Sequence, residues 1–169
     1  MSAEARNGEG VRVLLAAGGT GGHLFPAEAL ANALMARGAL VDLVSDERAT
    51  AYAGSFPAKL HAVSSGTVTG SGFIGRLMGA LRIAKGTREC LKLIGQLKPH
   101  VVVGFGGYPT VPPVYAATMR RVPSVIHESN AVMGRANKFL AAKVTYVATG
   151  FPLKDTQFAQ KTVVTGNPV

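Results

Sequence analysis

The stretch that decides the fold is VRVLLAAGGTGGHLFPAEAL, residues 11–30. An apolar, strand-like segment (11–16) comes first, then a glycine-rich run around Thr20 that ends in His23, and a helix-like segment (26–37) follows. Glycines at a strand-to-helix turn let backbone N–H groups come close to a ligand, and the start of the helix adds partial positive charge. The stretch therefore predicts a turn that binds phosphates or sugar hydroxyls, with His23 available for proton transfer.

This glycine pattern differs from the fingerprint of dinucleotide-binding proteins. If Gly19 and Gly21 are the first two glycines of G-x-G-x-x-G, Leu24 stands where the third glycine is required. An acid near the end of the next strand, Asp42 or Asp46, could still bind a ribose. A nicotinamide-dependent oxidoreductase therefore stays open as an alternative, and so does a purely structural turn.

Apolar strand-like segments alternate with helical ones along the rest of the chain. This alternation predicts an α/β fold, a doubly wound and mostly parallel Rossmann-like sheet with helices on both faces, in which ligands bind beyond the carboxyl ends of the strands. Pro26 and Pro112 are expected in first helical turns, where a missing N–H costs nothing. Residues 1–10 predict a flexible leader before a domain formed by 11–169. The expected strands are 11–16, 40–44, 59–63, 101–104, 124–127, 143–147 and 162–165, and the expected helices are 26–37, 47–54, 73–97, 112–120 and 133–142.

Two further loops follow predicted strands and should meet the first loop at the same sheet edge. GFGGYP, residues 104–109, could bind a second phosphate through backbone N–H groups, or it could be a tight connection only. HESN, residues 127–130, places a run of hydrogen-bonding side chains at a strand end, where an unpaired buried carboxylate would be costly. These side chains suit the orientation of sugar hydroxyls better than a metal, because no further His or Cys cluster supplies ligands.

The composition points to an anionic partner. The formal charge is +9 and the sequence pI is about 10.1, yet the chain has no Trp and no aromatic-basic module of the kind that binds RNA. The single cysteine, Cys90, cannot form an internal disulfide, which is typical of a reducing compartment. Basic and apolar residues mix within the predicted helix 73–97, which favours a membrane surface over a nucleic-acid groove. The residues expected to face the membrane are Phe73, Ile74, Arg76, Leu77, Met78, Arg82 and Lys85.

Four motifs in this order resemble the MurG family of bacterial N-acetylglucosaminyltransferases. They are GGTGGHLFPA (18–27), GFGGYPTVPP (104–113), HESN (127–130) and TGNPV (165–169), with Ser129 standing where the family more often has Gln. The resemblance implies the N-terminal half of a two-domain GT-B glycosyltransferase. That half would carry the acceptor and membrane side, and a C-terminal donor domain would hold most of the UDP-GlcNAc.

The resemblance also implies an activity and a set of roles. The family transfers N-acetylglucosamine, with inversion, from UDP-GlcNAc to the C4 hydroxyl of MurNAc in lipid I, which yields lipid II for peptidoglycan at the cytoplasmic face of the inner membrane. It needs no cofactor and no protein-bound metal. A base near neutral pKa is required for the C4 hydroxyl, and His23 or Glu128 could supply it. Donor contacts are expected from Thr20, Gly21, Gly22 and Asn130, and acceptor or pyrophosphate contacts from Gly18, Gly19, Gly106, Gly107, Tyr108 and His127.

Two other interpretations remain. The chain could be a non-catalytic, membrane-recruiting subunit of a split glycosyltransferase, or the nicotinamide-dependent domain considered above. The predicted helix 73–97 is also compatible with an ordinary core helix that has a solvated basic face.

Overall fold

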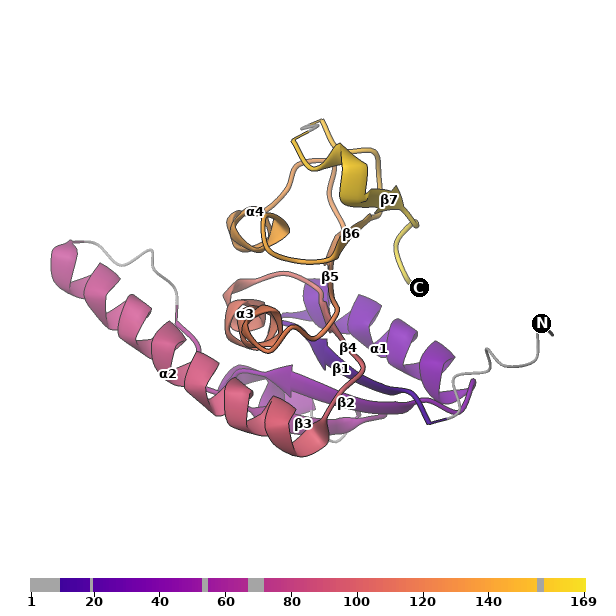
Figure 1. Cartoon of the computed structure of the whole chain (residues 1–169), viewed down its shortest axis with the longest axis horizontal. Coiled ribbons are helices and arrows are strands. Elements are labelled where there is room, and N and C mark those ends of the chain that lie inside the picture. Colours follow the sequence, from indigo (N-terminus) through magenta and orange to yellow (C-terminus); the bar gives the residue numbers. More distant parts are fainter. Residues whose placement is uncertain (1–9, 19, 53–54, 67–71, 155–156) are drawn as a thin grey trace.

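The core of the protein is a seven-stranded parallel sheet with the strand order β3-β2-β1-β4-β5-β6-β7 (Figure 1). The computed structural model describes residues 10–18, 20–52, 55–66, 72–154 and 157–169. The sheet order places β1 and β4 side by side at the centre, so that the loops after them lie at one edge. The strands are β1 (Arg12–Ala16), β2 (Leu40–Ser45), β3 (Lys59–Ala62), β4 (Val101–Gly104), β5 (Ser124–Glu128), β6 (Tyr146–Thr149) and β7 (Thr162–Val164).

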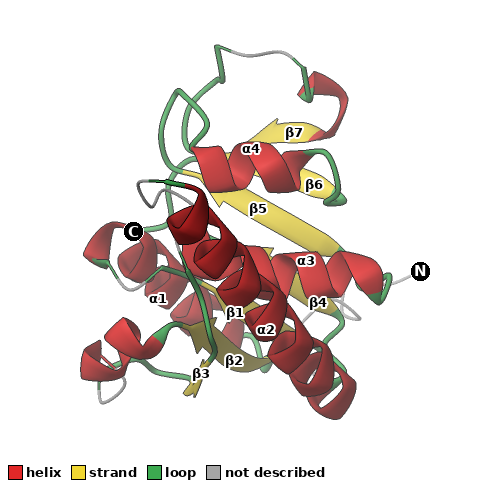
Figure 2. Cartoon of the chain, turned by 90° about the vertical axis from the view of Figure 1, so that its left-hand side faces the viewer, coloured by secondary structure: helices red, strands yellow, loops and turns green. Residues whose placement is uncertain are grey.

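Helices cover both faces of the sheet, which confirms the predicted doubly wound arrangement. Along β1, Leu14 and Ala16 join one buried cluster with residues of α2, α3 and α4, whereas Val13 and Leu15 join another with residues of α1. This alternation follows from the two-residue period of a strand. Figure 2 shows α2 crossing in front of α3 on one face of the sheet. The helices are α1 (Gly21–Met35), α2 (Phe73–Leu97), α3 (Val111–Met119) and α4 (Arg135–Ala141).

All seven predicted strands are confirmed, and the differences concern element ends. The sixth strand begins three residues later than predicted, because the backbone N–H groups of Lys143 and Val144 bond to Leu140 at the end of α4. The predicted helix 47–54 is a 3₁₀ segment, Glu47–Tyr52, within the described residues.

The expectation that Pro26 starts the first long helix is wrong. Helix α1 begins at Gly21, because Thr20 is extended and its carbonyl already accepts N–H groups from His23 and Leu24. Pro26 therefore lies inside α1, where its backbone nitrogen has no hydrogen to donate to the preceding turn. The glycine loop is consequently shorter than predicted, and His23 belongs to the first turn of a helix.

Helix α2 is the longest element and matches its predicted bounds. Its N-terminal end lies away from the rest of the protein (Figure 1), whereas its C-terminal half packs against α3. Cys90 lies on the packed side, where burial raises the pKa of its thiol to about 12. Gly86 faces the chain that follows β3: a Cβ at this position would overlap the carbonyl oxygen of Ser64. A glycine is therefore required where α2 meets the edge of the sheet.

We expect Gly86→Ala to lower the free energy of unfolding by about 1–3 kcal/mol, because the added methyl must push the backbone at Ser64 away. Urea unfolding followed by circular dichroism measures the change. Gly95→Ala, in the same helix, is the control. Its Cβ would meet only the flexible end of Arg120, so it should be neutral or stabilise by up to about 1 kcal/mol. Equal effects of the two substitutions would contradict the close approach at Gly86.

Candidate functional site

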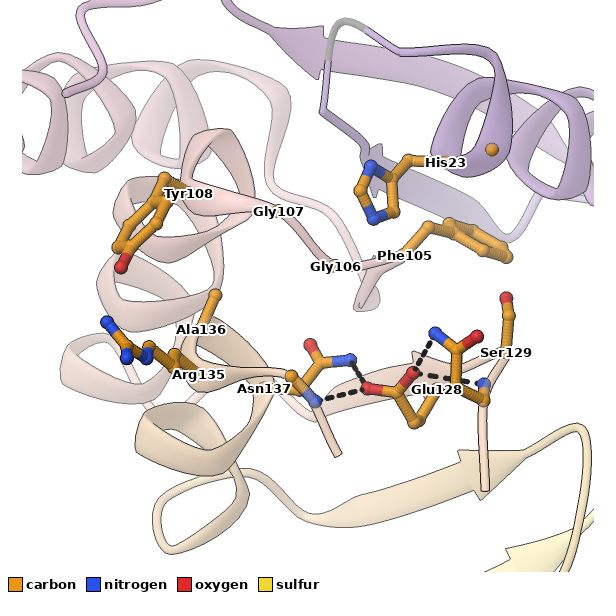
Figure 3. Close-up of a pocket in the computed structure, with 13 residues that line it drawn as sticks. His23, Phe105, Gly106, Gly107, Tyr108, Glu128, Ser129, Arg135, Ala136 and Asn137 are labelled. Atoms are coloured by element: carbon orange, nitrogen blue, oxygen red, sulfur yellow. Dashed lines mark hydrogen bonds between the residues drawn. The ribbon is translucent and has the colours of Figure 1, made fainter. Parts of the chain in front are cut away.

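A cavity of about 530 Å³ lies at the carboxyl ends of β1, β4 and β5 (Figure 3). It confirms that the three predicted loops converge, since each contributes to its wall. The start of α4 closes it as a fourth wall that the sequence did not predict. From the loops come Gly22, His23, Phe105, Gly106, Gly107, Tyr108, Glu128, Ser129 and Asn130, and from the fourth wall come Gly134, Arg135, Ala136 and Asn137.

The imidazole of His23 is packed between the first and second loops. A Cβ on Gly18 would lie 3.1 Å from His23 Nδ1, and a Cβ on Gly107 would lie 3.3 Å from His23 Cε1. Gly106 and Gly107 have φ angles of +90° and +79°, which side-chain-bearing residues rarely adopt. The glycines therefore serve to bring two backbones against one imidazole.

A hydrogen bond of 2.9 Å joins His23 Nδ1 to the hydroxyl of Thr20. It holds the ring from the side of α1, and Nε2 lies near the Cβ position of Gly106. Burial lowers the pKa of His23 below its ordinary value of 6.5, although the Glu128 carboxylate raises it in part. The imidazole is therefore mostly uncharged at neutral pH.

Glu128 organises the opposite wall of the cavity. It is 3% exposed and its two oxygens accept four hydrogen bonds: Oε1 from the backbone and side-chain amides of Asn130, Oε2 from the backbone of Gly134 and the side chain of Asn137. Burial alone would raise the pKa of Glu128, but these hydrogen bonds outweigh it and lower the pKa. The carboxylate thus fixes both the turn at Asn130 and the start of α4 (Figure 3).

Asn137 is a site residue that the sequence analysis missed. Its side-chain amide donates to Glu128 and to the carbonyl oxygen of His127, at 2.9 and 3.1 Å. Its own Oδ1 is buried and has no partner among the described residues. The sequence did offer one signal: an amide side chain stands between Ala136 and Leu140, on the apolar side of a predicted helix.

His127 does not line the cavity, in contrast to its predicted place beside the acceptor. Its ring is buried against Phe105, with centroids 5.6 Å apart, and Nε2 bonds to the carbonyl of Gly166 at 3.1 Å. Successive residues of a strand face opposite sides, so His127 points away when Glu128 points in. Gly18 and Thr20 lie behind His23 and not in the cavity wall, and Gly19 lies outside the described residues.

The predicted membrane residues lie at the N-terminal end of α2. Phe73 and Ile74 are 82% and 76% exposed, and Leu77 and Met78 are each half exposed beside Arg76. Arg82 and Lys85 lie further along the helix and line a separate hollow. Within the described residues, no helix combines the length and the apolar character that a membrane-crossing segment needs. The same residues contain no cluster of His, Cys, Asp or Glu that could hold a metal ion.

A known family matches most of the chain. Residues 13–149, most of the chain, match the glycosyltransferase family 28 N-terminal domain. The chain belongs to glycosyltransferase family 28. The match covers β1 to β6 and all of the loops that form the cavity. It favours a glycosyltransferase over the nicotinamide-dependent alternative.

The curated relatives of this chain share one name. The proteins from Chelativorans sp. (strain BNC1) and Agrobacterium fabrum are 58% and 57% identical to it over 162 and 159 residues. Both are named UDP-N-acetylglucosamine--N-acetylmuramyl-(pentapeptide) pyrophosphoryl-undecaprenol N-acetylglucosamine transferase. The alignments cover 95% and 93% of this chain but 43% and 42% of the relatives. The chain thus spans less than half the length of these relatives.

Solved structures agree with the family match and with the curated relatives. MurG from Acinetobacter baumannii superposes with a TM-score of 0.80 at 31% identity, over 94% of this chain and 46% of that one. This match confirms the resemblance to the MurG family and the N-terminal Rossmann-like fold of a GT-B glycosyltransferase. A UDP-GlcNAc 2-epimerase from Methanocaldococcus jannaschii superposes with a TM-score of 0.70 at 15% identity, over 93% of this chain and 46% of that one, which is a likeness of fold alone.

We expect Glu128→Gln to lower the free energy of unfolding at neutral pH by about 2–3 kcal/mol, because an amide would turn a donor toward groups that now donate to the carboxylate. A lowered pKa in the folded state means that the carboxylate's contribution is complete above the unfolded pKa and is lost as pH falls through the folded one. The gap between wild type and variant should therefore narrow on acidification, which urea unfolding between pH 7 and pH 3 measures.

Glu28→Gln is the matched control for this substitution. It removes the same charge from a residue of α1 that does not line the cavity, so it should change the stability little at any pH. A Glu128→Gln variant that unfolds like Glu28→Gln would contradict the organising role of Glu128.

Proposed function

We propose that this chain is the acceptor- and membrane-binding part of an enzyme that transfers N-acetylglucosamine from UDP-GlcNAc to the C4 hydroxyl of MurNAc in lipid I. The product would be lipid II, for peptidoglycan synthesis. The observation that carries the proposal is the imidazole of His23 held between two glycine loops, at the wall of a cavity whose opposite side is built by Glu128. The names of the relatives indicate the donor and the acceptor.

His23 is the group best suited to act as the base. In the tautomer that performs this task, Nδ1–H donates to Thr20 and leaves the Nε2 lone pair free. Nε2 takes the proton of the C4 hydroxyl as that oxygen forms its bond to the anomeric carbon of the donor. The bond from that carbon to UDP breaks with its electron pair on the diphosphate, so attack from the opposite side inverts the anomeric centre.

Glu128 is less suited to this role, because its four hydrogen bonds occupy both oxygens and lower its pKa. It is instead a positioning residue for Asn130 and Asn137. The unpartnered Oδ1 of Asn137 supports a ligand hydroxyl on this side. We assign the acceptor sugar to the side of Gly106, Gly107 and Tyr108, which line the same cavity.

The donor contacts proposed for this chain are few. Gly21 and Gly22 begin α1, where N–H groups lack helical partners and favour an anionic ligand, and Asn130 stands exposed at the rim. Thr20 would hold the imidazole of His23 and not contact the donor itself. Most of the UDP-GlcNAc would be bound by a C-terminal domain, and the relatives are more than twice as long as this chain.

The N-terminal end of α2 is proposed to bind an anionic membrane peripherally, at the cytoplasmic face where lipid I is used. Its exposed apolar side chains would enter the interface while neighbouring basic residues contact lipid headgroups. The acceptor would then reach the cavity without leaving the bilayer.

In a full-length transferase with this sequence as its N-terminal part, we expect His23→Ala to lower turnover by about 100-fold. The affinity for UDP-GlcNAc should change little, because the base acts on the acceptor. Because burial lowers the pKa of His23, the acid side of the wild-type pH profile should fall below pH 6.5. A radiolabelled transfer assay measures both quantities.

His100→Gln provides the control for His23→Ala. His100 stands before β4 at the opposite edge of the sheet, where its Nδ1 accepts the backbone N–H of Arg12. This variant should retain wild-type turnover. A His23→Ala enzyme that turns over equally fast would exclude His23 as the base.

We expect the triple change Phe73→Ser, Ile74→Ser and Met78→Ser to weaken binding to anionic vesicles by about tenfold or more, since apolar area no longer enters the interface. Vesicle sedimentation of this chain measures the partition coefficient. The control changes Leu40, Val163 and Val164 to Ser, because these apolar residues are 51–54% exposed, close to the 50% of Met78, but lie on strands. Equal losses in the two triple variants would count against α2 as the membrane contact.

A further inference from the structure

A second cleft lies at the carboxyl ends of β2 and β3, against the middle of α2. It consists of two adjoining hollows of about 420 and 230 Å³. Asp46, Arg48, Ser65 and Arg82 line both hollows, and the smaller one reaches Tyr108. Tyr108 also lines the His23 cavity, so the cleft adjoins that cavity through one side chain.

Two carboxylates, those of Asp46 and Glu89, hold residues that line the cleft. Asp46 is 7% exposed and its Oδ2 accepts Arg48 Nε at 2.7 Å. Glu89 accepts the backbone N–H of Ser64 at 2.7 Å and its hydroxyl at 3.1 Å. With the close approach at Gly86, these bonds hold the segment after β3 firmly against α2.

The cationic ends, in contrast, face outward. The side chains of Arg48 and Lys85 are 65% and 72% exposed, and Arg82 is exposed as well. Glu47 also lines the larger hollow, and the Lys85–Glu89 pair is long at 3.9 Å. Arg48 uses only one edge of its guanidinium on Asp46, which leaves N–H groups on the other edge for a second partner. Outward guanidinium groups suit the bidentate binding of phosphate oxygens.

The cleft lies between the His23 cavity and the apolar end of α2. Arg82 follows Met78 by four residues, one helical turn, so the two share a face of α2. On its other side the cleft meets the cavity at Tyr108. In the acceptor of the proposed function, the pyrophosphate is the covalent link between the sugar and the polyprenyl chain. A sugar in the cavity and a lipid at the end of α2 would therefore bring the pyrophosphate to this cleft.

We propose that Arg48 and Arg82 bind the pyrophosphate of the lipid-linked acceptor in this cleft. Lys85 adds charge at the rim, and Asp46 is a positioning residue for Arg48. This inference rests on the proposed function, and it moves the pyrophosphate from the glycine loops, beside which the acceptor sugar is placed, to the cleft.

The first test titrates this chain with inorganic pyrophosphate by isothermal titration calorimetry. Arg82→Gln should weaken binding by about tenfold or more, the loss expected for one charge-assisted contact. Arg88→Gln is the matched control, because it removes the same charge from the same helix but lies outside the cleft. Arg48→Lys keeps a positive charge beside Asp46 but loses the planar guanidinium with its paired N–H donors. This variant should also bind pyrophosphate more weakly. Equal pyrophosphate affinities of the Arg82→Gln and Arg88→Gln variants would overturn the proposal.

The second test separates a bound pyrophosphate from a general anionic surface. Phosphatidylcholine vesicles carry either undecaprenyl pyrophosphate or phosphatidylglycerol at equal total charge. Wild type and Arg88→Gln should prefer the undecaprenyl pyrophosphate vesicles, and Arg82→Gln should lose that preference while still binding phosphatidylglycerol. The same loss on both vesicles would overturn the proposal in favour of a headgroup contact.

In the full-length transferase, Arg82→Gln should raise the KM for lipid I about tenfold and leave the KM for UDP-GlcNAc unchanged. This outcome separates the two hypotheses. Absence of transfer by the wild type would refute the proposed function. An unchanged KM for lipid I in Arg82→Gln would refute only the assignment of the pyrophosphate to the cleft.

Discussion

The candidate site depends on how closely two glycine loops approach one imidazole. Gly18 on one side and Gly106 and Gly107 on the other leave room for the ring of His23 and for no additional side chain. This packing fixes the orientation of the ring and its partial removal from water. The lowered pKa of His23 follows from the same contact, because burial is its largest cause. The orientation of the His23 imidazole and its pKa thus depend on the same contact with the two glycine loops.

The fold could be read from the sequence because its signals are local and repeated. Apolar runs separated by helical segments predict a parallel sheet, and the three polar or glycine-rich loops each follow a strand, so their convergence is a consequence of topology. The facing of individual side chains was less accessible. His127 and Glu128 are adjacent and equally polar, yet only Glu128 faces the cavity, and the strand register that decides this depends on β5 pairing.

The remaining misses concern hydrogen bonds that a pattern of residue types does not reveal. Helix α1 starts before Pro26 because the Thr20 carbonyl accepts the first helical bonds, and proline position alone cannot reveal that. Asn137 joins the site because Glu128 reaches across to it, nine residues away. The Thr20 bonds are local, whereas the partner of Asn137 is chosen by the tertiary structure; in both cases a pattern of residue types indicates only that some partner must exist.

In the proposed function, the position of α2 relates the chemistry to the membrane. A helix of 25 residues is about 37 Å long, so its exposed N-terminal end can lie at a lipid surface while its other half remains packed in the core. The close approach of Gly86 to Ser64 fixes α2 rigidly at the level of the cleft. Arg82 is therefore held at a set height above the apolar end. A lipid-linked acceptor has a fixed order of lipid, pyrophosphate and sugar, and the protein repeats that order along one path: apolar end, arginine cleft, then the cavity of His23. This correspondence of order is stronger support for the acceptor side of the reaction than any one of the three surfaces considered alone.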